Sequence, residues 1–259
     1  MRIMQVIVAV LLAAVASGGE LPFRVGEKLC YRIYWGPLEA GVASLEVAGV
    51  EMVEGRGCYR FVARAQTSGL VDMLFHVDNV LESWMDAKEL CSVRYRQRRI
   101  EGKRVRHSET RYDYEAGRCV ITNYLKQTCQ VMPLDEPLQD LLSAVYYVRS
   151  RALELNRPLE FVVNAGDANH RVRVQPDQRK MVWTKPLGTR AALRVEPHPT
   201  LNVVAAHKGR MWIWVSDDVQ KVPLVVISRL AIGSARFQLT AVEYVDPTTP
   251  QRSRDASRS

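Results

Sequence analysis

The residues best suited to chemistry in this chain are five arginines spaced two apart on either side of a turn. They are Arg94, Arg96, Arg98, Arg104 and Arg106, and the turn is Glu101-Gly102. Because alternate residues of a strand share a face, the spacing predicts three arginines on one strand and two on its partner. Like charges opposite each other on neighbouring strands repel, so an anionic partner would relieve the repulsion. Arginine binds phosphate and carboxylate groups through paired donors, which indicates the headgroup of an anionic lipid or glycolipid.

The charge of the chain is concentrated around these arginines. Residues 94–111 hold eight cations and two carboxylates, whereas the whole chain has a net charge of +8. Once the two ends of the chain are set aside, the remaining residues are therefore close to neutral. An alternative role for the arginines is structural, because charged side chains keep an exposed strand edge from pairing with other chains.

Three tryptophans form the second candidate site for a ligand. Trp35, Trp212 and Trp214 lie in or beside predicted strands, and the alternation places Trp212 and Trp214 on the same face. In a curved sheet such residues can line a groove for an apolar or sugar ligand. The alternative is that all three pack in the hydrophobic core.

The sequence predicts no catalytic residues, no metal site and no cofactor. Its five histidines are dispersed, and no Cys-x-x-Cys pair suggests a zinc or redox site. Ser143 lies in a stretch with helical spacing rather than in the Gly-x-Ser-x-Gly turn of a serine hydrolase. Asp72, Asp78 and Glu82 form a cluster of acids that we expect to be solvated or structural.

The N-terminal residues predict export. A charged start is followed by an apolar stretch of about 14 residues that ends in Ala14-Val15-Ala16, which is typical of a cleaved signal peptide over residues 1–16. The stretch is shorter than the roughly 20 residues that a membrane-spanning helix needs. We expect the periplasm of a Gram-negative-type bacterium, which disfavours nucleic acid as a partner. Residues 246–259 are rich in Pro, Thr, Ser and Arg, and predict a disordered tail.

Export would place the five cysteines in an oxidising compartment. They are Cys30, Cys58, Cys91, Cys119 and Cys129. Sequence alone leaves the pairing open. Cys119 and Cys129 are the candidate disulfide, because they lie symmetrically about Tyr124 in an expected hairpin. The alternative is reduced cysteines that behave as small apolar residues.

Apolar alternation separated by turn residues predicts a mainly β fold over residues 17–245. It runs through residues 29–35, 43–47, 59–63 and 237–241, as expected for an antiparallel sheet with one solvated face. Helical spacing from Leu138 predicts a helix over about 138–153, and a second short helix is possible around residues 69–75. We expect a single, strongly curved antiparallel sheet or incomplete barrel, with the longer helix packed on its concave face.

Three stretches of the sequence carry a family resemblance. They are Phe23–Gly36 with the nearby Ala40-Gly41-x-Ala43, then Asp140–Arg149, and finally Trp214–Leu224. Together they resemble the bacterial exported family catalogued as domain of unknown function 3108. The resemblance implies a periplasmic, β-rich protein, similar in pattern to the curved half-barrel of the envelope lipoprotein carriers, in which a sheet shelters an acyl chain. It assigns no catalytic residues.

From these features we expect an exported, non-enzymatic protein that binds an apolar or amphiphilic, lipid-like ligand in the bacterial envelope. One alternative is a structural or assembly factor that binds another envelope protein by strand addition at a sheet edge. Another is a hydrolase or transferase that acts on envelope glycolipids. The sequence leaves the identity of the ligand and the oligomeric state open.

Overall fold

The computed structural model describes residues 21–166, 168–199, 210–229 and 233–245. The predicted signal peptide and the predicted tail lie outside the described residues. Within the described part of the chain, no helix combines the length and the apolar character that crossing a membrane requires.

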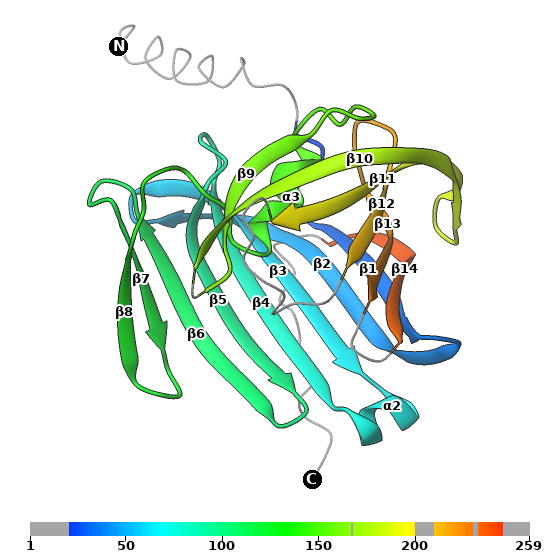
Figure 1. Ribbon diagram of the computed structural model, residues 1–259, viewed down its shortest axis with the longest axis horizontal. Helices are drawn as coiled ribbons and strands as arrows, with labels where there is room; N and C mark the ends of the chain where they lie inside the picture. Colours follow the sequence, from blue (N-terminus) through cyan, green and yellow to red (C-terminus); the bar gives the residue numbers. More distant parts are fainter. Residues whose placement is uncertain (1–20, 167, 200–209, 230–232, 246–259) are drawn as a thin grey trace, which may run out of the picture.

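The described strands form one antiparallel sheet of 14 strands, as the alternation predicts (Figure 1). Their order in the sheet is β8-β7-β6-β5-β4-β3-β2-β1-β14-β13-β12-β11-β10-β9. The strands are β1 (Glu27–Trp35), β2 (Leu38–Val53), β3 (Arg56–Thr67), β4 (Val77–Asp86), β5 (Ser92–Glu101), β6 (Arg104–Asp113), β7 (Arg118–Asn123), β8 (Thr128–Pro133), β9 (Leu159–Asn164), β10 (Asn169–Thr184), β11 (Gly188–Pro199), β12 (Met211–Ser216), β13 (Pro223–Arg229) and β14 (Ser234–Tyr244).

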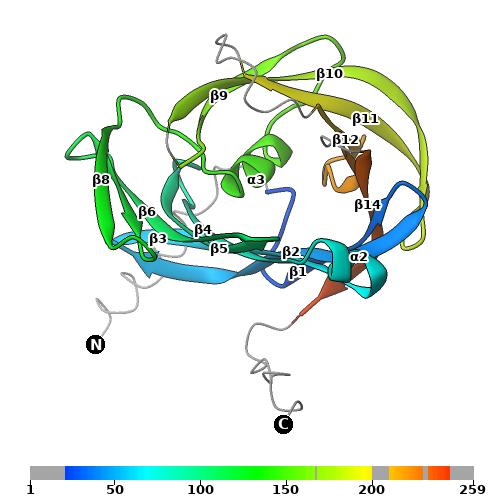
Figure 2. The ribbon, with the colours of Figure 1, turned by 60° about the horizontal axis from the view of Figure 1, so that its bottom comes forward.

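The sheet curls into an incomplete barrel whose ends are β8 and β9 (Figure 2). The chain connects these two strands through residues 134–158, which include helix α3 (Ser143–Arg149) inside the curve. The concave packing of a helix is confirmed, but the predicted bounds of 138–153 are wrong. The reason is that Gln139 forms a parallel bridge to Val163 of β9, so the backbone before residue 143 is committed to the sheet rather than to the helix.

Successive hairpins place their turns at alternate ends of the strands. The turns β1–β2, β3–β4, β5–β6 and β7–β8 therefore share one end, which we call the lower rim and which lies at the bottom of Figure 1. The opposite end, the upper rim, carries the turns β2–β3, β4–β5 and β12–β13. Helix α2 (Gly69–Leu74), the second predicted helix, forms most of the β3–β4 connection at the lower rim.

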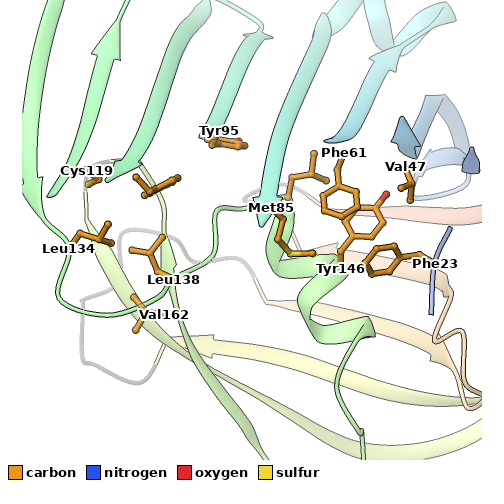
Figure 3. Close-up of a cluster of buried hydrophobic side chains, with 12 residues drawn as sticks. Phe23, Val47, Phe61, Met85, Tyr95, Cys119, Leu134, Leu138, Tyr146 and Val162 are labelled. Carbon is orange, nitrogen blue, oxygen red and sulfur yellow. The ribbon is translucent and has the colours of Figure 1, made fainter. Parts of the chain in front are cut away.

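Alternate side chains of the strands point inward and pack against α3 (Figure 3). The ring of Tyr146 stacks on Phe61 of β3, with the ring centres 3.6 Å apart and the planes 7° apart. Phe23 meets both rings edge-on. The half of the barrel that contains α3 is thus filled by the protein's own side chains.

Candidate functional site

The last residue of α3, Arg149, holds the helix to the upper end of the sheet. Its side chain is 1% exposed, and its guanidinium donates from Nη1 to Glu27 Oε1 at 2.6 Å and from Nη2 to Glu27 Oε2 at 3.1 Å. Nη2 also donates to the carbonyl of Pro22, and Nε donates to the carbonyl of Gln220. A buried charge needs both an opposite charge and satisfied donors, and Arg149 has both.

The three stretches that carry the family resemblance meet at this point. Glu27 belongs to the first stretch, Arg149 to the second and Gln220 to the third. A further bond, from the hydroxyl of Tyr31 to the carbonyl of Pro223 at 2.9 Å, joins the first stretch to the third. These contacts therefore fix where the interior helix lies against β1 and the β12–β13 turn.

The first turn of α3 is held by a second buried group, the carboxylate of Asp140. Oδ2 accepts hydrogen bonds from the hydroxyls of Ser83 at 2.6 Å and Ser92 at 2.7 Å. Oδ1 accepts from the backbone N–H groups of Leu142 and Ser143, so Asp140 caps the helix. Burial raises the pKa of Asp140 above its ordinary value of 3.8, although these hydrogen bonds act in the opposite direction.

Asp140 and Arg149 act on the structure rather than on a substrate. Both side chains are enclosed, and each is already saturated by partners from the chain itself. The hydroxyl of Ser143 bonds to Ser92 at 2.7 Å and lies beside Asp140, with no histidine among its hydrogen-bonding partners in the described structure. The described residues also contain no group of three His, Cys, Asp or Glu side chains placed to hold a metal ion.

The five candidate arginines do not converge on one patch, because the strand register separates them. Arg96 lies opposite Glu109 and Arg98 lies opposite His107, whereas Arg106 lies opposite Arg99 and Arg104 opposite Glu101. Residues of β5 with even numbers thus share a face with residues of β6 with odd numbers. Arg94, Arg96 and Arg98 consequently lie on the outer face of the sheet, and Arg104 and Arg106 take the other face.

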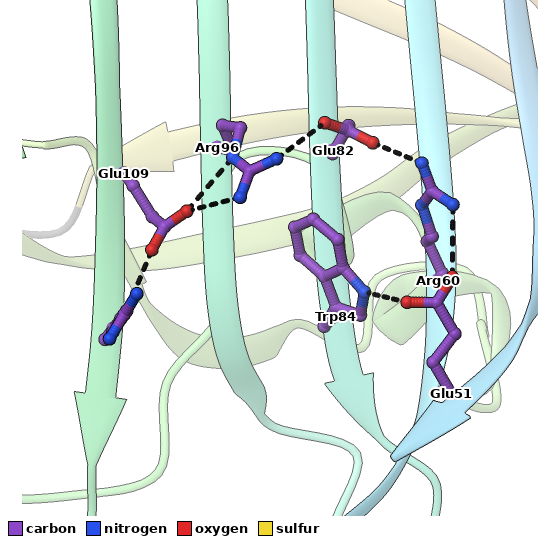
Figure 4. Close-up of polar contacts among 7 residues, drawn as sticks. Glu51, Arg60, Glu82, Trp84, Arg96 and Glu109 are labelled. Atoms are coloured by element: carbon purple, nitrogen blue, oxygen red, sulfur yellow. Dashed lines mark hydrogen bonds and ion pairs between the residues drawn. The ribbon is translucent and has the colours of Figure 1, made fainter. Parts of the chain in front are cut away.

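On the outer face, Arg96 belongs to a ladder of alternating charges that crosses five strands, from β6 to β2 (Figure 4). Arg96 pairs with Glu109 at 2.7 Å and with Glu82 at 3.7 Å, and Glu82 pairs in turn with Arg60. The ladder continues from Arg60 to Glu51 at 3.1 Å. Burial alone would raise the pKa of Glu109, but the bonds from Arg96 and Arg111 outweigh it and hold the pKa below its ordinary value.

The other two arginines of the outer face are also paired with carboxylates. Arg94 reaches Glu54 at 3.5 Å, and Arg98 reaches Asp78 at 2.8 Å. The guanidinium groups of Arg60, Arg94 and Arg96 all lie within 5.7 Å of the ring centre of Trp84, whose indole N–H donates to Glu51. The repulsion that suggested an anionic ligand at Arg94, Arg96 and Arg98 is therefore relieved within the protein.

The acids expected to be solvated or structural take part in such contacts. Glu82 and Asp78 hold arginines, as described above. Asp72 accepts a hydrogen bond from the hydroxyl of Thr67 at 2.5 Å and lies 2.8 Å from Nδ1 of His76. Each of these carboxylates thus has a partner in the chain.

The three candidate tryptophans occupy separate environments. Trp214 is buried in the core, with the ammonium of Lys180 3.9 Å from its ring centre. Trp212 donates its indole N–H to Glu196, which also holds Arg210. Trp35 packs at the lower end of β1, where its ring lies beside Gly233. A shallow groove on the surface is lined by Trp212, Ile227, Arg229, Gly233 and Ser234.

A more continuous apolar surface lies on the inner face of β2, β3 and β4, toward the lower rim. It consists of Ala43, Leu45, Ala63, Ala65 and Leu81, which we call the inner strip. These side chains pack against three separate core clusters, yet each is only partly buried. By contrast, Val47 and Phe61, which continue the same face toward α3, are fully buried. The barrel is thus filled around α3 and accessible along the inner strip.

Comparison with known families finds a match over most of the chain. The family model described as "Protein of unknown function (DUF3108)" matches residues 30–240. The chain belongs to the DUF3108 family. No curated protein matches it.

A solved structure shows the same kind of fold as this DUF3108 chain. It is the β-barrel-like protein of domain of unknown function DUF1849 from Brucella abortus, which is 12% identical in sequence with a TM-score of 0.59. The match covers 86% of this chain and 98% of that one. At this level of identity the similarity concerns the fold alone, which is an incomplete barrel in line with the expectation from sequence.

The predicted disulfide of this DUF3108 member is not formed. The register places Cys119 opposite Met132 and Cys129 opposite Thr122, so the two cysteines are three positions apart along the β7–β8 hairpin. Three positions correspond to about 10 Å along a strand and to opposite faces, which exceeds the reach of a disulfide. All five cysteines are free, with Cys119 buried and Cys129 exposed.

Sequence reasoning missed the inner strip, and a signal for it was present. Ala43 and Ala63 occupy inward positions of predicted strands, where larger apolar residues would fill the space, and Ala65 continues the alternation after Ala63. Small inward residues near one end of several strands indicate a hollow at that end. Which of these strands are neighbours depends on the sheet order, which a single sequence does not supply.

Proposed function

We propose that this protein binds the apolar part of an amphiphilic, lipid-like ligand along the inner strip. The observation that carries the proposal is the partial burial of Ala43, Leu45, Ala63 and Leu81, although their neighbours on the same face are buried among core side chains. Apolar side chains that face the inside of a barrel and still reach solvent are suited to cover an acyl chain. The closed end is provided by α3, which Arg149 and Asp140 hold in place.

The polar end of such a ligand would lie at the lower rim. Arg104 and Arg106 are exposed there on the same face of β6 as the inward-facing Tyr112, and neither forms an ion pair with a described residue. Arg99, which lies opposite Arg106, is engaged by Glu101. The proposal therefore assigns the anionic headgroup to Arg104 and Arg106 in place of Arg94, Arg96 and Arg98.

Native mass spectrometry of the protein purified from a bacterial envelope without detergent tests this proposal. We expect a population of molecules with the added mass of an amphiphile, which organic extraction releases. Consistent recovery of ligand-free protein that also fails to take up added fatty acid or phospholipid would contradict it.

The strand β8 supports a second candidate function, the binding of another envelope protein by strand addition. β8 ends the sheet, and its residues are mostly exposed, with Val131 among the exposed apolar side chains. A free edge of this kind can pair with a strand of a partner. Crosslinking from position 131 in whole cells distinguishes strand addition from ligand binding, because a dominant protein adduct at β8 would favour strand addition.

A further inference from the structure

Helix α2 presents an unusual concentration of apolar side chains to solvent. Leu70, Met73 and Leu74 are 73%, 84% and 76% exposed, and Phe75 is half exposed. We call these four residues the apolar knuckle. The remaining apolar residue of the helix, Val71, is buried against Ile33 and Ala40, so the inward face of α2 is already satisfied. Helix α2 is therefore packed against the sheet through Val71, and the knuckle is exposed although the helix is packed.

The position of the knuckle is fixed by hydrogen bonds before and after α2. The backbone N–H of Ser68 donates to the carbonyl of Ala40 at 2.9 Å, and Asp72 is held by Thr67 and His76. The backbone N–H of Gly102 in the β5–β6 turn donates to the carbonyl of His76 at 2.7 Å. The ring of Phe75 lies against Gly102 so closely that a Cβ there would approach it to 2.8 Å.

The turn that touches the knuckle carries cations. Lys103, Arg104 and Arg106 lie within four residues after Gly102, all three are exposed, and none forms an ion pair with a described residue. The one carboxylate of α2, Asp72, is engaged by Thr67 and His76. The β5–β6 turn with its three cations thus lies beside α2 at the lower rim, and the contacts of Gly102 with His76 and Phe75 join the two segments (Figure 1).

We propose that the lower rim docks on the surface of an anionic lipid bilayer, with the apolar knuckle inserted among the headgroups. Protruding apolar side chains lose contact with water when they enter the headgroup–acyl boundary, and neighbouring cations gain from the negative surface potential. The combination fits a bilayer, since the apolar side chains are largely exposed and the cations beside them lack a carboxylate partner among the described residues. Docking of this kind goes beyond ligand binding, because it does not require the inner strip to be occupied.

Sedimentation with vesicles of phosphatidylglycerol and phosphatidylcholine tests the docking. The full chain is compared with the triple variant Leu70→Ser, Met73→Ser, Leu74→Ser and with the triple variant Lys103→Ala, Arg104→Ala, Arg106→Ala. We expect partitioning to fall about ten-fold or more in the first variant. In the second it falls about five-fold for each cation at low salt. In 1 M salt the effect of the cations disappears, because the charges are screened over about 3 Å.

Matched controls come from the upper rim. Met52 and Val219 are 72% and 81% exposed, and Lys88 and Lys185 are exposed cations in turns at that end. Replacing the first two with Ser, or the last two with Ala, should leave partitioning unchanged. A tryptophan at position 73 (Met73→Trp) should be quenched by brominated acyl chains, whereas one at position 52 (Met52→Trp) should not.

Wild-type protein that does not bind the vesicles, or control variants that lose as much binding as the knuckle variant, would overturn the docking. Its failure can be separated from failure of the proposed ligand site. The substitution Ala43→Phe should block the inner strip and leave vesicle binding intact. The knuckle variant should still take up a soluble amphiphile.

Discussion

Arg149 and Glu27 form a buried, bidentate ion pair, although 122 residues separate them in the chain. The pair joins the interior helix to the first strand of the sheet. Carbonyl groups of Pro22 and Gln220 satisfy the donors that Glu27 leaves free. The closed end of the barrel thus depends on a contact between distant segments.

Removal of one partner of this pair should destabilise the fold strongly. In Arg149→Leu, the carboxylate of Glu27 remains buried without its counter-charge, which costs about 3–5 kcal/mol of unfolding free energy. The double variant Arg149→Leu with Glu27→Leu should recover part of this loss, since no unpaired charge remains. Urea unfolding measures both values. As a control, Arg157→Ala removes an exposed pair with Glu154 and should change stability by less than about 0.5 kcal/mol. Equal losses in Arg149→Leu and Arg157→Ala would contradict the role of the buried pair.

The stacked rings of Tyr146 and Phe61 give a second prediction. The hydroxyl of Tyr146 is buried and has no hydrogen-bond partner among the described residues. Tyr146→Phe should therefore be neutral or stabilising, because a buried polar group without a partner carries a desolvation cost. Tyr146→Ala removes the stack and should cost about 3–5 kcal/mol. A loss above about 1 kcal/mol in thermal unfolding of Tyr146→Phe would show that the hydroxyl has a partner after all.

The ladder on the outer face predicts a dependence of stability on pH. The pKa of Glu109 is lower in the folded protein than its ordinary value of 4.5. Its contribution is therefore complete above about pH 4.5, and it is lost as the pH falls through the lower, folded pKa. At pH 7 we expect the free energy of unfolding of wild type to be about 1 kcal/mol higher than that of Glu109→Gln. The difference is modest because Arg96 and Arg111 are partly exposed and screened by solvent. The difference should shrink toward pH 3. A difference that stays constant between pH 7 and pH 3 would argue against ionised Glu109 in the ladder.

The cysteines should differ in reactivity as their burial does. At pH 8 in the reduced, native protein, Cys129 should react rapidly with a thiol reagent. Cys58 and Cys119 should react only after unfolding, and burial also raises the pKa of Cys58 to about 11. Peptide mapping of air-oxidised protein should find no bridge between Cys119 and Cys129. The variant Cys129→Ser controls for the fast phase, which should vanish in it, and a fast phase that persists would contradict the assignment.

The fold followed from sequence because its signals are local. Alternation in β1, and turn residues such as Glu54-Gly55, identify strands and hairpins without knowledge of any distant contact. The start of α3 was predicted too early because the bridge from Gln139 to Val163 is a tertiary contact, and no local signal reveals it.

The prediction that the five arginines share one face was wrong for a related reason. Spacing alone correctly grouped Arg94 with Arg96 and Arg98, but it could not supply the register with β6. One residue of register decides whether Arg104 faces the same side as Arg96, because side chains alternate strictly along a strand. Spacing likewise could not show that Glu82 of β4 would neutralise Arg96.

The central claim is that the inner strip binds an acyl chain, and a matched pair of substitutions tests it most directly. Ala43 belongs to the inner strip, whereas its neighbour Val42 in the same strand is exposed to solvent. A fluorescent fatty acid is titrated into wild type, Ala43→Phe and Val42→Phe. The account predicts saturable binding to wild type and to Val42→Phe, with affinity reduced at least about ten-fold in a folded Ala43→Phe. No saturable binding to wild type, or equal binding to all three proteins, would contradict it.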